Sequence, residues 1–254
     1  MKSPTSFGPR PLYSGNNRYD FHRGLDIASP SGTPFFAIAN GEVQIAGEHP
    51  SYSDLLVAVR HLRPGASDCE PQGCYTALYL HAGGWVVQAG EPVLKGQLLG
   101  YTGASGSGFE HLHFEIRNSL DEKPTNPLLY GFSVRDATNP NITGLFAYPL
   151  SDSAQVNQSQ KRIEITFSRQ ADGAYLAEPV TASGLIGFGI ETYDRQDLAA
   201  NKNGVYRVEQ RVNGKTYTDM DFKAFSFGET RYINTLIDYP YYARYRNRIQ
   251  KCFR

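Results

Sequence analysis

Residues 110–116, with the sequence EHLHFEI, constrain the fold of this chain more than any other stretch. Polar and apolar side chains alternate strictly there, which predicts a β-strand with one face in a core. The apolar face carries Leu112, Phe114 and Ile116. The opposite face carries Glu115 and two imidazoles, His111 and His113, about 7 Å apart along the strand. An ordinary fold needs no such pair, and the spacing lets one imidazole bind a metal while the other contacts a water on it.

The composition excludes several classes of protein. Of the 254 residues, 40% are hydrophobic and 20% are charged, which is typical of a globular protein. The formal net charge is zero, and no basic run precedes the last dozen residues, so we expect no nucleic-acid partner. No apolar run reaches the roughly 18 residues of a membrane helix. The 25 glycines, 15 prolines, 17 tyrosines and 14 phenylalanines favour short strands and turns over long helices.

The cysteines bear on the compartment. The first residues, MKSP, lead into a turn-rich segment and not a signal peptide, so either the protein is cytosolic or this is a mature fragment with an added start methionine. Cys69 and Cys74 flank a loop with proline and glycine, a spacing that suits a small disulfide in an oxidising compartment. Two reduced thiols are the alternative. The third cysteine, Cys252, has no predicted disulfide partner.

Turn signals and composition predict two domains. Asn40-Gly41 predicts a hairpin within residues 34–46. Further strands are expected at 54–62, 75–81 and 93–100. Between residues 124 and 149 the composition shifts to asparagine, proline, threonine and glycine, so we place one domain at 1–135 and a second at 136–254.

The second domain contains no histidine. Its predicted strands lie roughly 10–15 residues apart, and Asn213-Gly214 predicts a type I′ hairpin among them. This spacing predicts a small β-sandwich of the immunoglobulin-like kind. A short helix is expected after residue 239.

A second histidine pattern lies near the N-terminus. His22 and Asp26 are four residues apart, which would place them on one face of a helix, but Gly24 and the SPSG sequence at 29–32 argue against a helix. A tight turn at Gly24 leading into a short strand could converge the same side chains. Alone, this pair is weak evidence for a metal, and surface hydrogen bonding is the alternative.

Five groups together match the requirements of a hydrolytic zinc site, which takes three protein ligands and leaves one position for water. One further group can take a proton from that water, and another can stabilise the developing oxyanion. The five candidates are His22, Asp26, His81, His111 and His113. Calcium or magnesium would favour oxygen ligands, and a closed structural zinc site usually has four ligands, often cysteines. We expect His49 to be exposed, and His61 to serve packing or lie at the surface and not to bind the metal.

The glycine-rich loop at 102–108 precedes a predicted strand and lacks a following lysine. It therefore favours a slim loop beside a substrate groove over a phosphate site.

These motifs resemble the lysostaphin/LytM-type zinc endopeptidases, which cut the peptide part of bacterial cell walls. The resemblance runs from about Phe7 to Arg117 and includes His-x-x-x-Asp, Tyr-x-His and Gly-x-x-His-Leu-His-Phe-Glu-Ile-Arg. It implies an all-β fold, mainly antiparallel, of the duplicated-hybrid-motif barrel-sandwich type, with a groove above the sheet. A looser similarity extends to the β-sandwich appended to some of these enzymes in Gram-negative bacteria.

The resemblance also implies residue roles. His22, Asp26 and His113 would bind one Zn²⁺ per chain, and His81 and His111 would act as the general base and the transition-state stabiliser. The substrate would be a peptidoglycan peptide, and the protein a monomer in the periplasm, in the cell envelope or secreted. A catalytically silent wall-binding or hydrolase-activating module is the alternative. Such modules usually lack ligands, and because all five groups are present here, we expect an active enzyme.

Overall fold

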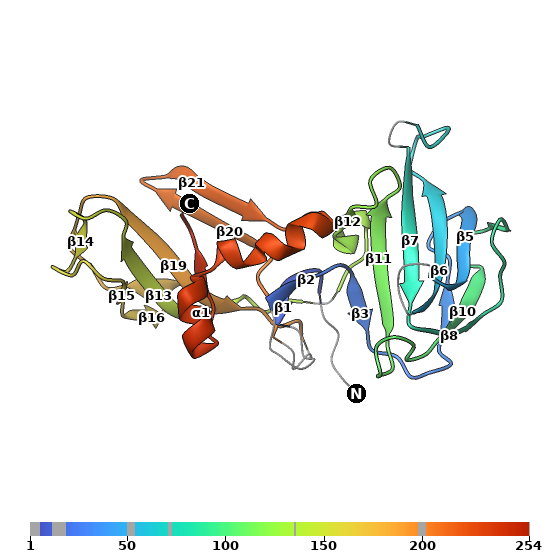
Figure 1. Cartoon of the computed structure of the whole chain (residues 1–254), viewed down its shortest axis with the longest axis horizontal. Coiled ribbons are helices and arrows are strands. Elements are labelled where there is room, and N and C mark those ends of the chain that lie inside the picture. The colour runs from blue at the N-terminus through green and yellow to red at the C-terminus, as the bar shows by residue number, and fades with distance from the viewer. Residues whose placement is uncertain are drawn as a thin grey trace.

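The computed structural model describes residues 6–11, 19–49, 54–70, 73–134, 136–197 and 202–253. Within them the fold is mainly antiparallel β-structure, with few helical segments. Figure 1 shows a large sheet at one end of the molecule and the C-terminal strands at the other, with the two N-terminal strands between them. None of the helices in the described part of the chain is long and apolar enough to cross a membrane.

The largest sheet has seven strands. Six of them have the order β12-β11-β7-β6-β5-β9, and the seventh, β3, pairs with β11. Its strands are β3 (Leu25–Ile27), β5 (Gly41–Glu48), β6 (Leu55–Leu62), β7 (Cys74–Leu80), β9 (Pro92–Val93), β11 (Leu112–Asn118) and β12 (Pro124–Thr125). A smaller sheet has the order β4-β10-β8. It consists of β4 (Pro34–Phe36), β8 (Ala82–Trp85) and β10 (Leu98–Thr102).

The main core lies on one face of the large sheet. It includes the apolar residues predicted from the alternation of 110–116, together with side chains of β7 and of the small sheet. Members from these elements are Leu112, Phe114, Ile116, Tyr79, Phe35 and Leu99. The alternation prediction is therefore confirmed, and the opposite face of β11 is left for the histidines.

Of the two predicted hairpins, one is confirmed and one is wrong. At Asn213 and Gly214, φ angles of 52° and 80° form the turn between β20 (Arg207–Val212) and β21 (Lys215–Asp221). At Asn40-Gly41, however, β4 pairs with β10 and β5 pairs with β6. Glycine at position 41 lets β5 and β6 approach closely, since a Cβ there would lie 2.4 Å from the carbonyl oxygen of Arg60.

The C-terminal strands form one four-stranded sheet, β15-β13-β19-β22, and three two-stranded ribbons, β14-β18, β16-β17 and β20-β21. The remaining strands here are β13 (Asn141–Pro149), β14 (Gln155–Val156), β15 (Ile163–Glu164), β16 (Phe167–Arg169), β17 (Tyr175–Ala177), β18 (Ala182–Ser183), β19 (Ile186–Tyr193) and β22 (Ile249–Lys251). The immunoglobulin-like sandwich is not confirmed. Many of these strands are only two or three residues long, and among the described residues they form separate two-stranded ribbons and not a second large sheet that could pack on the first. The division at residue 136 stays a prediction.

Helical segments are short. They are the 3₁₀ helices η1 (Pro127–Tyr130) and η2 (Phe227–Leu236) and the helix α1 (Tyr239–Tyr245). The Asp238 side chain caps α1 by accepting a hydrogen bond from the backbone N–H of Tyr241. A short helix after residue 239 is therefore confirmed.

The N-terminal strands β1 (Gly8–Pro11) and β2 (Tyr19–His22) form a two-stranded ribbon. Side chains near this ribbon pack against the segment that leads into and forms η2. We call this group the junction cluster; its buried members are Phe7, Phe21, Phe222, Phe225 and Ile233. It joins the first and last parts of the described chain.

Cys69 and Cys74 form a disulfide, and Cys252 is a free, buried thiol. Replacing both disulfide cysteines with serine should lower the free energy of unfolding by about 2 kcal/mol, because a cross-link across so short a loop restricts the unfolded chain only modestly. Urea unfolding of the oxidised protein and of the double variant measures the difference. Dithiothreitol should destabilise the wild type and leave the double variant unchanged; equal stability of the two oxidised proteins would contradict this prediction.

Candidate metal centre and active site

Three strands bring His22, Asp26 and His113 together. His22 ends β2, Asp26 lies in β3, and Asp26 is the direct partner of His113 in the β3-β11 pairing. The turn between β2 and β3 presses against β11, and a Cβ on Gly24 would lie 2.1 Å from the carbonyl oxygen of Phe114. Glycine at this position therefore lets a four-residue spacing converge two side chains outside a helix.

The donor atoms of these residues form a small triangle. His22 Nε2 lies 3.0 Å from Asp26 Oδ1 and 3.1 Å from His113 Nδ1, and the last two atoms are 2.7 Å apart. In a tetrahedral zinc site with bonds of 2.0–2.1 Å, neighbouring donors lie about 3.3 Å apart. The triangle thus matches one face of such a tetrahedron with a slight contraction, and two imidazoles with one carboxylate are a donor set that zinc accepts.

Hydrogen bonds on the outer side of the triangle orient each donor. The Nδ1–H of His22 donates to the carbonyl oxygen of Ser6 at 2.8 Å, and the Nε2–H of His113 donates to Glu115 Oε1 at 3.0 Å. Arg10 Nη1 donates to Asp26 Oδ2 at 2.8 Å. When both rings are neutral, their protons point outward and three lone pairs converge at the centre, an arrangement that a cation stabilises.

The pKa values reflect this crowding. Burial lowers the pKa of His22 to about 4, against the attraction of Asp26. Burial also opposes the charging of His113, but its hydrogen bonds to Asp26 and Glu115 outweigh burial and raise its pKa to about 9. The pKa of Asp26 lies well below its usual value, because the neighbouring histidines outweigh the effect of burial. Without a metal, His113 therefore carries an added proton on the Nδ1 that faces Asp26, and a cation bound at the centre would take the place of that proton.

Glu115 is itself held in place. Its Oε2 accepts a hydrogen bond from Arg117 Nε at 2.7 Å, and both side chains are buried. Burial would raise the pKa of Glu115, but His113 and Arg117 hold it at about 2. Glu115 was predicted to lie on the histidine face but not to have a role there, although its position two residues after His113 was the available signal.

His81 and His111 lie beside the triangle. Their ring centroids are 4.4 Å apart, and each has a ring nitrogen within 4.8 Å of one on the other and on His113. His111 Nε2 lies 3.5 Å from Asp26 Oδ1, and its Nδ1–H donates to the carbonyl oxygen of Phe109 at 3.1 Å. The structure thus brings all five predicted site residues together, although their individual roles stay predictions.

The groups that orient His81 were not predicted from the sequence. The Nδ1–H of His81 is shared between the carbonyl oxygen of Ser105, at 2.7 Å, and Asp54 Oδ2, at 2.8 Å. Asp54 Oδ1 also accepts hydrogen bonds from the Ser105 hydroxyl and from the backbone N–H of His81. Only the register of β6 against β7, which places Leu56 opposite Leu80, could have indicated that Asp54 reaches His81.

The other histidines lie outside this cluster. His61 is fully buried and bonds through Nδ1 to the carbonyl oxygen of Asn40 at 3.0 Å, which fits the packing role expected for it. His49 is partly buried, not exposed as expected, because it borders a cavity.

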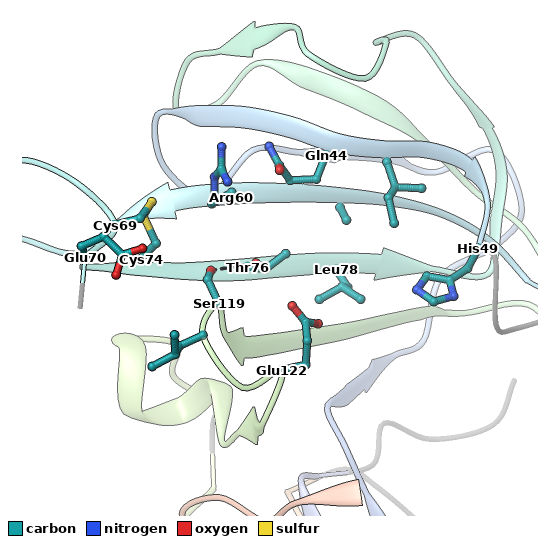
Figure 2. A pocket seen from close by; sticks show the side chains of 13 residues that line it. Gln44, His49, Arg60, Cys69, Glu70, Cys74, Thr76, Leu78, Ser119 and Glu122 are labelled. Atoms are coloured by element: carbon teal, nitrogen blue, oxygen red, sulfur yellow. Dashed lines mark hydrogen bonds between the residues drawn. A yellow bond between two sulfur atoms is a disulfide. The ribbon is translucent and has the colours of Figure 1, made fainter. Parts of the chain in front are cut away.

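That cavity, of about 350 Å³, lies over β6 and β7. Figure 2 shows the Cys69–Cys74 disulfide at one end of it and His49 at the other. Leu78 lines the cavity and is the direct partner of Glu115 in the β7-β11 pairing. Paired residues point to the same face of a sheet, so the cavity lies on the face that carries His113.

Gly24→Ala tests the turn that joins the two N-terminal donors. Because its Cβ would overlap a backbone atom of β11, the variant should lose about 1–3 kcal/mol of unfolding free energy. Thermal unfolding of the metal-free protein measures this loss. Gly84→Ala, where a Cβ meets nothing within 4 Å, is the matched control and should stay at wild-type stability. Equal stability of the two variants would contradict the close approach.

Comparisons with known proteins agree with this geometry. The family model described as Peptidase family M23 matches residues 20–127, a range that contains all five clustered residues. Peptidoglycan DD-endopeptidase ShyA of Vibrio cholerae is 29% identical over 168 residues, which cover 65% of this chain and 34% of that protein. Lipoprotein NlpD of Yersinia enterocolitica is 34% identical over 105 residues, which cover 41% of this chain and 96% of that protein.

Among solved structures, the catalytic domain of lysostaphin from Staphylococcus simulans is 25% identical. The match covers 51% of this chain and 91% of that domain, with a TM-score of 0.40. The chain spans only 34%, 36% and 26% of three Vibrio cholerae relatives named peptidoglycan DD-endopeptidases. The family match over the clustered residues and the near-complete coverage of a relative at 34% identity lead to one conclusion: this chain belongs to peptidase family M23.

Proposed function

We propose that this protein is a zinc-dependent endopeptidase that hydrolyses peptide bonds in bacterial peptidoglycan. Its membership of peptidase family M23 supports peptide hydrolysis, and the names of its relatives support this substrate. The observation that carries the proposal is the triangle of His22, Asp26 and His113, with donor atoms 2.7–3.1 Å apart and two further imidazoles beside it.

His22, Asp26 and His113 would hold one zinc ion. When bound by three protein donors, zinc acts as a Lewis acid and lowers the pKa of water to roughly 7. Ser6, Arg10 and Glu115 would keep the three donors in the orientation that this requires.

His81 and His111 would carry out the proton transfer and the charge stabilisation. The carboxylate of Asp54, 2.8 Å from His81 Nδ1, fixes the tautomer and the orientation of that ring and leaves Nε2 to accept a proton, which favours His81 as the general base. His111 bonds through Nδ1–H to the carbonyl oxygen of Phe109, so its Nε2 would face the reaction, and in the imidazolium form that Nε2–H would donate a hydrogen bond to the developing oxyanion.

The substrate peptide would lie on the sheet face that carries both the imidazoles and the cavity. Peptidoglycan lies outside the cytoplasm, and the Cys69–Cys74 disulfide fits an oxidising compartment, so we propose a periplasmic, cell-envelope or secreted location. We also propose that the protein is a monomer, with residues 1–135 as the catalytic domain and 136–254 as an accessory domain.

Mass analysis of muropeptides released from purified walls tests the proposal. The wild type loaded with zinc should release fragments cut within the peptide part. Chelation should stop the release, and added zinc should restore it. If zinc-loaded wild type binds walls and releases nothing, the protein is a silent wall-binding module and the proposal is wrong.

A further inference from the structure

The part of the chain after residue 200 contacts residues that adjoin or hold the supports of all three candidate metal donors. Each donor has an outer hydrogen-bond partner, and those partners are Ser6, Arg10 and Glu115. Each of these partners is next to, or bonded to, a residue that contacts Gly204 or the segment 222–233.

The support of His22 leads to the junction cluster. Ser6, which accepts the His22 ring proton, precedes Phe7, and the ring of Phe7 lies 5.0 Å from that of Phe225. Phe21, which precedes His22, stacks on the same ring at 4.4 Å. Phe225 therefore holds the segment that contains the donor and the segment that contains its support.

The support of Asp26 leads to a backbone contact. Arg10, which bonds to Asp26, follows Pro9, and the N–H of Gly204 donates to the carbonyl oxygen of Pro9 at 3.0 Å. A Cβ on Gly204 would lie 2.1 Å from that oxygen. Any side chain at position 204 would therefore have to displace β1, which carries Arg10.

The support of His113 leads to Phe227, at the start of η2. The guanidinium of Arg117, which holds Glu115, lies over the Phe227 ring with Cζ 5.0 Å from its centroid. The guanidinium of Arg23, the residue after His22, lies 4.7 Å from the same centroid. Both distances are within the range of cation–π attraction, so one ring stabilises the cation that follows His22 and the cation that holds Glu115.

We propose that the C-terminal region is a working part of the metal centre, in which Phe227, Phe225 and Gly204 position the outer supports of the metal donors. This inference rests on the proposed function only in taking the triangle as the metal site. It assigns an effect on metal affinity to a region that contains no histidine. Phe227 is thus a positioning residue that acts through Arg117 and Glu115.

Metal affinity of the full chain tests this role directly. Phe227→Leu keeps an apolar side chain and removes the aromatic face, whereas Phe227→Tyr keeps that face. Loss of an outer support typically weakens metal binding by 10–100-fold, so we expect Phe227→Leu and Gly204→Ala to weaken zinc binding by about tenfold. Phe227→Tyr should restore the affinity. Gly228→Ala, in the same helix with open space around the new Cβ, is the matched control and should bind as the wild type does.

Zinc affinity is measured by competition with a chromophoric chelator, and the absorption of the cobalt-loaded protein reports the donor geometry. Amide hydrogen exchange of the wild type provides a test without any substitution. If the region supports the site, zinc should slow exchange within residues 222–233 and leave the β20-β21 ribbon unchanged, because coupling is reciprocal.

The outcomes separate this inference from the proposed function. Zinc affinities of folded Phe227→Leu and Gly204→Ala within threefold of wild type, or an equal loss in Gly228→Ala, would overturn the inference and leave the endopeptidase intact. Should both variants fail to fold, unchanged exchange at 222–233 on zinc addition would overturn it instead. Wild type that binds no zinc at all would overturn the proposed function.

Discussion

Replacing His113 with alanine should abolish metal binding by the purified protein. Its Nδ1 lies 2.7 Å from Asp26 Oδ1 and 3.1 Å from His22 Nε2, so its removal leaves only two donors of the triangle. We expect the zinc content to fall from one ion per chain to near zero after dialysis, as measured by atomic emission, and wall hydrolysis to stop with it.

His49→Ala is the matched control, since this histidine lies outside the cluster and should leave the zinc content unchanged. Circular dichroism shows whether His113→Ala remains folded. Full zinc occupancy in folded His113→Ala would contradict the assignment of the donors, because the ion would then reside elsewhere.

Replacing His81 with alanine should keep the metal and remove turnover. His81 is adjacent to the triangle but belongs to none of its three short distances, so zinc content should remain at one ion per chain. Loss of a general acid or base typically costs a factor of 10²–10⁴, and we expect a fall in the rate of muropeptide release of that size. Initial rates on dye-labelled walls measure it.

Asp54→Asn is a milder variant that tests the same role of His81. The carbonyl oxygen of Ser105 still accepts the His81 ring proton in this variant, so the loss of rate should be smaller than in His81→Ala. Loss of zinc in His81→Ala, or an unchanged rate, would contradict the division between binding and catalysis.

The candidate centre is assembled from parts that are distant in the sequence. Its donors come from β2, β3 and β11, and two of their supports, Ser6 and Arg10, come from the first described segment. The junction cluster then connects that segment to residues 222–233. A change far from the histidines can therefore alter the site by moving a support and leaving every donor in place.

The sequence by itself determined the features that depend on neighbouring residues. Alternation in 110–116 predicted which side chains of β11 enter the core, and Asn213-Gly214 predicted the β20-β21 turn. Cys69 and Cys74 were close enough along the chain for their pairing to be predicted. These features follow from strand periodicity, from preferred φ angles and from short loops, which are all local properties.

Only the tertiary structure decided the rest. Asn40-Gly41 has the local signature of a hairpin, yet β4 pairs with β10, because pairing across the molecule outweighs a turn preference. The supports of the site could not be predicted either. Asp54 reaches His81 only through strand register, and Arg10 reaches Asp26 from a separate two-stranded ribbon. Phe227 reaches Arg117 across more than a hundred residues. Residue types and spacing mark the candidate donors, whereas the distances that let them act together arise from long-range packing, which no local pattern encodes.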